Sequence, residues 1–313
     1  MKKSNQERLK DYEEYMKIQN YSSSTIKSYL LGLRQFLAFK EKYNLDLTID
    51  QEQARQFILF KYDNGAKWQT INNVYSALRK YFREVIHSEW TTKKIKRPRR
   101  ERTLPVLINK EEVQKIIEHC TMYKYQVFIS LLYCTGMRLS ECINLKLEHV
   151  DGQRKEILIK SGKGGKDRYI NLPDSILGLL RSYYLREQPK AYLFNGKYKG
   201  KRLSTRSAQR GIKVGVHQAK ISKQVSSHTF RHCYATHHLE AGTNIVYLQK
   251  QMGHKHLKTT ARYINLSKTY HQQIVHPIDT LEIQYMNNRR RSVNYLEIME
   301  SATSKPTGRG LIK

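Results

Sequence analysis

Apolar residues recur at every third or fourth position through most of the first 90 residues, which is the spacing of one helix face. A long example lies in residues 22–39, behind serines suited to cap a helix. Its apolar stripe is formed by Ile26, Tyr29, Leu30, Leu33, Phe36 and Leu37. A further stripe runs from Trp68 to Phe82, and Asp50 with Gln53 has the spacing of a capping box. The pattern predicts a domain of four helices in residues 1–92.

The pattern of the remaining chain is mixed. Helical periods return at about 110–119, behind the expected cap of Asn109 and Glu112, and again at about 123–134. The runs KEILIK at 155–160 and RYINL at 168–172 are expected to be two short strands, and the glycine-rich turn SGKGGKD joins them into a hairpin. From residue 174 the pattern is helical, with breaks near Gly196, Gly242 and Gly253. We therefore expect a mainly α protein with a small antiparallel β-sheet, and a second, mixed domain at 105–270.

The net charge of the chain indicates what kind of partner it binds. The chain has 57 basic and 27 acidic residues, a formal net charge of +30, which points to a polyanion, nucleic acid first and anionic membrane second. Residues 1–92 hold 15 basic and 11 acidic side chains, whereas residues 93–313 hold 42 and 16. Within 188–278 there are sixteen basic residues and a single acid, Glu240. The alternative interpretation is a basic surface that contacts only solvent.

The segment KKIKRPRRER separates the two patterned regions and has no apolar period. It predicts an extended interdomain linker at 93–104 whose charge favours contact with a phosphate backbone, the alternative being a solvated linker without a ligand. Its candidate DNA-binding residues are Lys93, Lys94, Lys96, Arg97, Arg99, Arg100 and Arg102.

The four cysteines contain no CxxC pair, and three of them sit in apolar helical patterns. Reduced core thiols are therefore expected. The first residues, MKKSNQERLKDYEEYM, lack an apolar signal region, and no run of 18 apolar residues occurs. We expect a soluble, cytoplasmic protein without a membrane partner.

HTFRHCYATHH, at residues 228–238, raises the choice between a metal and a phosphate as ligand. His228 and His232 share one helix face, as in many zinc helices. A protease-like zinc site needs Glu at position 229, which is Thr, and the acid-poor surroundings lack the carboxylates of a magnesium nuclease. We therefore expect neither metal nor cofactor. Arginines must then neutralise a phosphate, and Arg231 is suited to this role.

Two further motifs carry groups of the same chemistry. TGMRLSEC places Arg138 at the start of a helix, with Glu141 three residues later to hold it, although a surface ion pair is the plainer interpretation. QMGHKHLKTTARYIN places Tyr263 on a short helix, nine residues after His254. With 22 tyrosines in the chain, composition alone does not select this one. A phenol has a pKa of about 10, so a nucleophilic tyrosine needs a base and a strongly positive setting.

In order and spacing, TGMRLSE, the GKG hairpin, HTFRH, GH and the following tyrosine resemble the tyrosine recombinases, the phage integrase family. The resemblance spans roughly residues 5–270. It implies an N-terminal SAM-like core-binding domain and a catalytic domain that together form a C-shaped clamp on DNA. The layout is nearest to Xer-type, integron and transposon-borne integrases.

The resemblance also implies residue roles. Arg138 and Arg231 are expected to hold the scissile phosphate, with Glu141 supporting Arg138. Lys163 is expected to protonate the leaving 5′ oxygen, and His228 to transfer a proton. His254 is expected to contact the phosphate, and Tyr263 to be the nucleophile of a 3′-phosphotyrosyl link. His232, His237 and His238 are expected to be packing or surface residues.

The resemblance further implies double-stranded DNA at a specific recombination site as the partner. Homo-oligomers are expected on DNA, a dimer on each site and a tetramer in synapsis. A mobile-element integrase is the favoured role because of the long tail and the high charge, the alternative being a dimer resolvase of Xer type. A type IB topoisomerase and a non-catalytic DNA-binding protein are the alternatives of other classes. The tail, 271–313, is expected to contact another protomer, or DNA through Arg289, Arg290 and Arg291.

Overall fold

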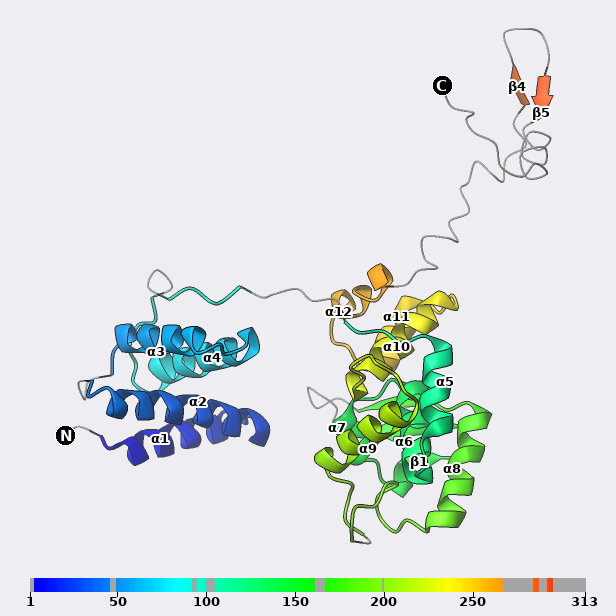
Figure 1. Cartoon of the computed structure of the whole chain (residues 1–313), viewed down its shortest axis with the longest axis horizontal. Coiled ribbons are helices and arrows are strands. Elements are labelled where there is room, and N and C mark those ends of the chain that lie inside the picture. The colour runs from blue at the N-terminus through cyan, green and yellow to red at the C-terminus, as the bar shows by residue number, and fades with distance from the viewer. Residues whose placement is uncertain are drawn as a thin grey trace. The chain divides into compact units, whose positions relative to one another are not determined.

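The chain divides into two compact units, Met1–Leu104 and Pro105–Lys313. The computed structural model describes residues 3–45, 49–91, 95–99, 105–160, 167–198, 200–266, 284–286 and 292–294, and Figure 1 labels their helices and strands. Each unit has its own hydrophobic core. No helix among these residues is long and apolar enough to cross a membrane.

The first unit consists of the four helices that the apolar stripes predict. They are α1 (Asn5–Ile18), α2 (Ser23–Lys42), α3 (Gln51–Asp63) and α4 (Trp68–Glu84). The side chains of Ser4, Ser22 and Asp50 cap the first three helices by accepting backbone N–H groups, which have no partner inside a helix. The helices close over a core rich in aromatic rings, which includes Tyr12, Phe36, Phe57, Tyr75 and Phe82.

The basic segment at the end of this unit is only partly exposed to solvent where the structure describes it. Trp90 and Ile95 are buried in the core of the first unit, and Arg97 donates to the side chain of Asn72 on α4 at 2.9 Å. Lys96 and Arg99 are exposed. The start of the expected linker is therefore held against α4 by one apolar anchor and one hydrogen-bonded arginine.

The second unit is built around α6 (Tyr123–Thr135), whose residues Val127, Phe128, Ile129, Leu131 and Leu132 are all buried. A helix that is apolar on every side has to be covered on every side. It packs against α5 (Lys110–His119), α7 (Leu139–Ile143), α8 (Asp174–Glu187), α9 (Thr205–Gln218) and α10 (Ser227–Glu240). The expected cap of α5 is present as a reciprocal capping box between Asn109 and Glu112.

The small sheet of this unit has three antiparallel strands in the order β1 (Val150–Asp151), β2 (Glu156–Ile159) and β3 (Arg168–Asn171). In the β2–β3 register Ile157 pairs with Ile170, and both are buried, as is Ile159. Along β2 the buried positions thus alternate with outward ones. The two-residue β1, which follows the 3-10 helix η1 (Leu147–His149), was not predicted from the sequence.

The helices that follow bring the motif containing His254 and Tyr263 close to α10. They are α11 (Ile245–Met252), α12 (Leu257–Ala261) and the 3-10 helix η2 (Ile264–Leu266). Tyr263 lies in the turn between α12 and η2, so its expected place on a helix is wrong. In the tail, β4 (Gln284–Met286) and β5 (Ser292–Asn294) form an antiparallel pair, while Arg289, Arg290 and Arg291 lie outside the described residues. The observed fold confirms a mainly α protein with a small antiparallel sheet.

Candidate active site

Arg138 directly precedes α7 and is held by the carboxylate of Glu141. Its Nη1 donates to Glu141 Oε1 at 2.7 Å, and its backbone N–H donates to Oε2 at 2.9 Å. The Arg138 side chain is 20% exposed and that of Glu141 is 7% exposed. The carboxylate therefore holds both the guanidinium and the backbone N–H of Arg138, while part of the guanidinium remains open to solvent.

Arg231 lies on α10 and is only 4% exposed. Its guanidinium donates to the carbonyls of Gly136, which follows α6, and Met252, the latter at 2.7 Å, and to His254 Nε2 at 2.8 Å. Burial and then the charge of Arg138 lower the pKa of Arg231 to about 10, so it stays protonated at neutral pH. One buried cation thus joins the ends of α6 and α11 to α10.

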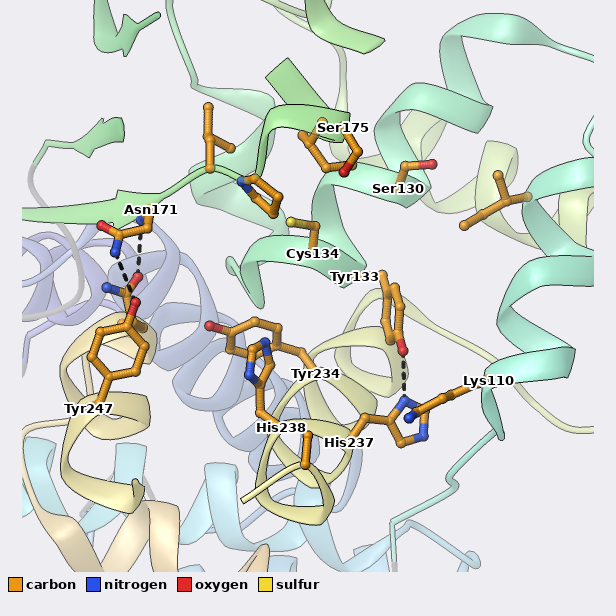
Figure 2. Close-up of a pocket in the computed structure, with 16 residues that line it drawn as sticks. Lys110, Ser130, Tyr133, Cys134, Asn171, Ser175, Tyr234, His237, His238 and Tyr247 are labelled. Carbon is orange, nitrogen blue, oxygen red and sulfur yellow. Dashed lines mark hydrogen bonds between the residues drawn. The ribbon is translucent and has the colours of Figure 1, made fainter. Parts of the chain in front are cut away.

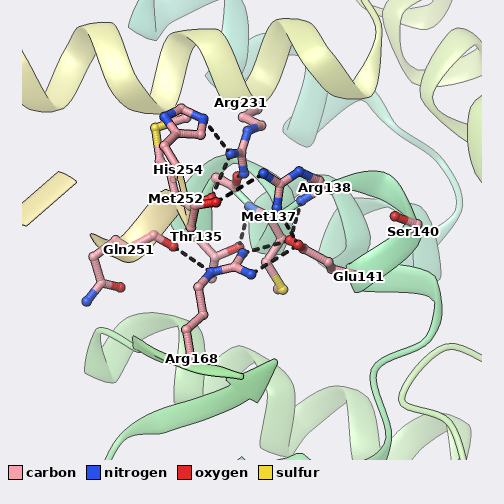
Figure 3. A network of polar contacts seen from close by, with 12 residues as sticks. Thr135, Met137, Arg138, Ser140, Glu141, Arg168, Arg231, Gln251, Met252 and His254 are labelled. Atoms are coloured by element: carbon pink, nitrogen blue, oxygen red, sulfur yellow. Dashed lines mark hydrogen bonds and ion pairs between the residues drawn. The ribbon is translucent and has the colours of Figure 1, made fainter. Parts of the chain in front are cut away.

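The C-terminal turn of α11 receives three guanidinium groups, which Figure 3 shows converging from separate elements. The last carbonyls of a helix have no partner within it and carry its negative dipole end, so cations are favoured there. The distances from guanidinium nitrogen to carbonyl oxygen range from 2.7 to 3.3 Å. The pairs are Arg168 with Gln251, Arg231 with Met252, and Arg138 with Gly253.

His254 begins the segment that leads from this turn to Tyr263. Because the Arg231 guanidinium has only donors, His254 Nε2 accepts, and the proton of the neutral ring lies on Nδ1, 2.8 Å from the hydroxyl of buried Thr260. Burial, followed by the charges of Arg231 and Arg138, lowers the pKa of His254 to about 4. The ring is therefore neutral at physiological pH and fixed in orientation from both sides.

The hydroxyl of Tyr263 contacts His232, a histidine that was expected from the sequence to be a packing or surface residue. His232 Nδ1 lies 3.1 Å from the Tyr263 hydroxyl, and the two ring centroids are 5.6 Å apart. Tyr263 is 4% exposed. Burial raises its pKa, against the opposing pull of Arg231, Arg262 and Arg138. Burial and then His228 lower the pKa of His232 to about 4, so its free nitrogen lone pair is available at neutral pH.

His228 stands one helical turn before His232 on α10, and its ring stacks near that of His232 with centroids 6.4 Å apart. The residue is exposed at the surface of the cluster. Loss of hydration and then the charges of Arg231 and Arg138 lower its pKa. His228 is thus a neutral ring open to solvent beside the two arginines.

The structure brings together most of the residues that the sequence singles out. Glu141 supports Arg138, and Arg138 and Arg231 both donate to the turn before His254, while Arg231 also contacts the His254 ring. Lys163 lies outside the described residues, as do Lys93, Lys94, Arg100 and Arg102.

Two residues of the cluster were missed by the reasoning from sequence. His232 was expected to be structural, yet it is the side chain whose nitrogen contacts the Tyr263 hydroxyl. Arg168 was not singled out at all, although it forms a two-bond ion pair with Glu141 at 2.7 and 3.0 Å. The available signal for Arg168 was a charged residue opening an otherwise apolar strand, five positions after Lys163.

A cavity of about 690 Å³ lies elsewhere in the second unit, between α5, α6, α10, α11 and the start of α8 (Figure 2). Its polar lining includes His237 and Tyr133, which share a hydrogen bond of 2.8 Å, and His238 beside Tyr234. None of the expected catalytic residues that the structure describes lines it. The cluster around Arg138 and Arg231 is therefore the candidate active site.

Comparison with known proteins assigns both units. Residues 107–269 match the phage integrase family, and residues 9–92 match the N-terminal SAM-like domain of phage integrases. A tyrosine recombinase of Thermosipho africanus is 32% identical over 80% of this chain and 91% of that protein. The tyrosine recombinase XerA of Pyrococcus furiosus is 31% identical over 88% of this chain and 94% of that protein.

Solved structures share the fold. The XerH site-specific recombinase bound to its difH substrate superimposes with a TM-score of 0.65 and 23% identity, over 86% of this chain and 84% of that chain. A lambda integrase dimer bound to a core site gives a TM-score of 0.68 and 16% identity, over 82% of this chain and 94% of that chain. With both units matched in sequence and fold, the chain belongs to the phage integrase family and is a site-specific tyrosine recombinase.

Proposed function

We propose that the chain cleaves and rejoins duplex DNA at a specific site through a 3′-phosphotyrosyl link on Tyr263, without metal or ATP. The observation that supports this most is the 3.1 Å contact between the Tyr263 hydroxyl and His232, in a cluster with two phosphate-binding arginines. A neutral imidazole beside a phenol is suited to accept the phenolic proton. The cationic surroundings favour the phenolate that forms.

In the proposed reaction the Tyr263 oxygen attacks the scissile phosphorus and the bond from phosphorus to the 5′ oxygen breaks. Arg138 and Arg231 pair with the non-bridging oxygens and stabilise the charge of the transition state. Lys163 is assigned the proton for the leaving 5′ oxygen, and His228, exposed beside the arginines, a further proton transfer. The phosphodiester energy is retained in the new bond, so attack by a 5′ hydroxyl reverses the step.

The proposed partner is double-stranded DNA, held by both domains as a clamp, with one dimer on a site and a tetramer in synapsis. The charge distribution supports this, because the basic excess lies in residues 93–313. The printed descriptions of two similar structures, XerH with its difH substrate and a lambda integrase dimer on a core site, name DNA complexes. The exposed Lys96 and Arg99 are proposed to contact the phosphate backbone.

The proposed biological role is integration of a mobile genetic element. The long tail and the high charge favour it, and a transposon integrase is among the proteins of similar fold. A dimer resolvase of Xer type is the second candidate, favoured by the identity to XerA over most of the chain.

The experiment that tests the function begins by trapping the chain on DNA in its source cells and sequencing the DNA that stays covalently attached. A nicked suicide duplex with the recovered sequence then serves as the substrate. Wild-type protein should accumulate a covalent adduct, and Tyr263→Phe should form none while keeping its DNA affinity. An adduct of wild-type level with Tyr263→Phe would show that the nucleophile is misassigned.

The same experiment separates the alternatives. Trapped sequences at the ends of a mobile element support an integrase, whereas one chromosomal site without element ends supports a resolvase. Relaxation of any plasmid without site-dependent joining supports a type IB topoisomerase. DNA binding with no adduct from the wild-type chain supports a non-catalytic DNA-binding protein.

A further inference from the structure

We propose that Arg168 is a positioning residue of the recombination site, which holds Arg138 in place through Glu141. The inference rests on the proposed function, because it concerns the same phosphate-binding cluster. The roles implied by the family motifs do not include an arginine at this place. The inference comes from the contacts that Arg168 makes in the described structure.

The donors of Arg168 are directed at protein groups. Nη1 and Nη2 donate to the two oxygens of Glu141 at 3.0 and 2.7 Å, and Nε donates to the carbonyl of Gln251 at 3.0 Å. The Arg168 side chain is 11% exposed, about half the exposure of Arg138. Both terminal nitrogens of Arg168 face the carboxylate that holds Arg138, so the effect of Arg168 on the site passes through Glu141.

Glu141 depends on Arg168 for its charge. Burial alone would raise the pKa of this carboxyl, but the hydrogen bonds and charge of Arg168, with those of Arg138, lower it to about 2. Glu141 in turn holds both the guanidinium and the backbone of Arg138. Without Arg168 the buried carboxylate would have a single cationic partner and two fewer hydrogen bonds, so it would be less firmly charged and less firmly placed.

Arg168 also joins the sheet to the turn that carries His254. It opens β3, and the same strand contacts α11 through the backbone N–H of Asn171, which donates to the side chain of Gln251 at 3.3 Å. A Cβ added at Gly253 would lie 2.9 Å from Arg168 Nε, so the guanidinium fills the space beside the turn. Displacing Arg168 would therefore loosen the turn as well as Glu141.

The test uses the full-length chain and the suicide duplex with the recovered site. Arg168→Met keeps the length of the side chain and removes its charge and donors. Single-turnover cleavage should fall about 10- to 100-fold, the range expected when a reacting group is displaced by about 1 Å. Affinity for the same duplex should stay within about 3-fold of wild type, because the role assigned to Arg168 is to position Glu141 and Arg138 and not to bind DNA. Arg168→Lys should cleave at an intermediate rate.

A double-mutant cycle distinguishes action through Glu141 from a general loss of structure. Glu141→Gln should also slow cleavage, and Arg168→Met with Glu141→Gln should be no slower than the worse single variant, because both changes break one path. Arg186→Met, which removes an exposed arginine on α8, is the control for charge and should cleave at the wild-type rate. Thermal melting of each variant reports whether it is folded.

The dependence of the cleavage rate on pH, on the acid side of its optimum, gives a readout that a general loss of structure would not change. Cleavage by Arg168→Met should decline at a higher pH than cleavage by wild type, because the pKa of Glu141 rises, and the double variant should lack this shift. If Arg168→Met does not fold, the comparison of the double variant with Glu141→Gln alone replaces it, and equal rates support the proposal.

Three results would overturn the role of Arg168. They are wild-type cleavage by Arg168→Met, penalties that multiply in the double variant, and a loss confined to DNA affinity. A wild-type chain that forms no adduct would instead reject the proposed function, so the two failures are separable.

Discussion

At the scale of single residues, the site combines permanent cations with uncharged histidines. Arg138 and Arg168 pair with the carboxylate of Glu141, whereas Arg231 donates to two backbone carbonyls and to His254. Burial lowers the pKa values of His232 and His254 to about 4, with His228 as the next cause for His232 and Arg231 as the next cause for His254. An incoming phosphate would supply negative charge, so the cluster is suited to bind an anion while the neutral ring of His232 can accept a proton.

The low pKa of His232 predicts how stability depends on pH. Below pH 6.5 the unfolded chain protonates this ring, whereas the folded protein resists protonation until about pH 4. The contribution of the neutral His232 ring to stability should therefore be complete above pH 6.5 and be lost as the pH falls toward 4. His232→Asn removes this titration and should reduce the loss by about 1–2 kcal/mol. Melting temperatures measured across the window check this.

The control for that prediction is His256→Asn, which replaces an exposed histidine in the same region. Its melting temperatures over the same pH window report how much of any change comes from replacing a histidine in this region. If His232→Asn loses as much stability as wild type between pH 6.5 and 4, the ring does not titrate as described.

Single residues were predictable from sequence where a motif carries them. Arg138, Arg231 and His254 lie around one turn, and the family resemblance had assigned all three of them to the scissile phosphate. His232 and Arg168 were not predicted, for a physical reason. Their roles depend on partners 31 and 27 residues away in sequence, Tyr263 and Glu141, and such contacts exist only once the helices and the sheet have packed.

At the scale of elements, the end of α11 organises the site. Gly253 caps this helix with φ +62°, a left-handed conformation that costs a residue with a side chain roughly 1–2 kcal/mol. The turn that it makes presents Gln251, Met252 and its own carbonyl to the three arginines and directs the chain into His254. Helix end, sheet and catalytic motifs therefore meet because one glycine reverses the chain.

Replacing Gly253 separates backbone strain from the clash with Arg168. Gly253→Ala brings both, whereas Gly242→Ala, after α10 at φ +80°, brings strain alone because nothing lies within 4 Å of the added carbon. Gly242→Ala should lower the free energy of unfolding by about 1 kcal/mol and leave cleavage unchanged. Gly253→Ala should cost about 1 kcal/mol more and also slow cleavage. Denaturant unfolding and the suicide substrate measure the two effects, and equal behaviour of both variants would contradict the packing described.

Elements were predictable where a periodic pattern was long. The helices of the first unit and α5, α6 and the β2–β3 hairpin occur where the pattern placed them. The two-residue β1 carries no period to detect. Tyr263 follows the five-residue α12 in a turn, and so short a helix ends where tertiary contacts allow rather than where propensity dictates.

At the scale of the whole molecule, charge is the property most visible in the sequence. Each phosphate contact by Lys or Arg contributes about 0.9 to the slope of log affinity against log salt concentration. Replacing the exposed Lys96 and Arg99 by Gln should therefore reduce the slope by about 1.8 and leave the sequence preference intact. Binding measured by fluorescence anisotropy over a range of salt concentrations tests this, and an unchanged slope would place both side chains away from DNA.

The central claim is that Tyr263 attacks the scissile phosphate, and peptide mapping tests it most directly. Wild-type protein is reacted with the nicked suicide duplex, digested with trypsin and nuclease, and analysed by tandem mass spectrometry. The account predicts a nucleotide attached through its 3′ phosphate to Tyr263 in the peptide that follows Arg262. A nucleotide attached to any other residue, or attached to Tyr263 through a 5′ phosphate, would contradict it.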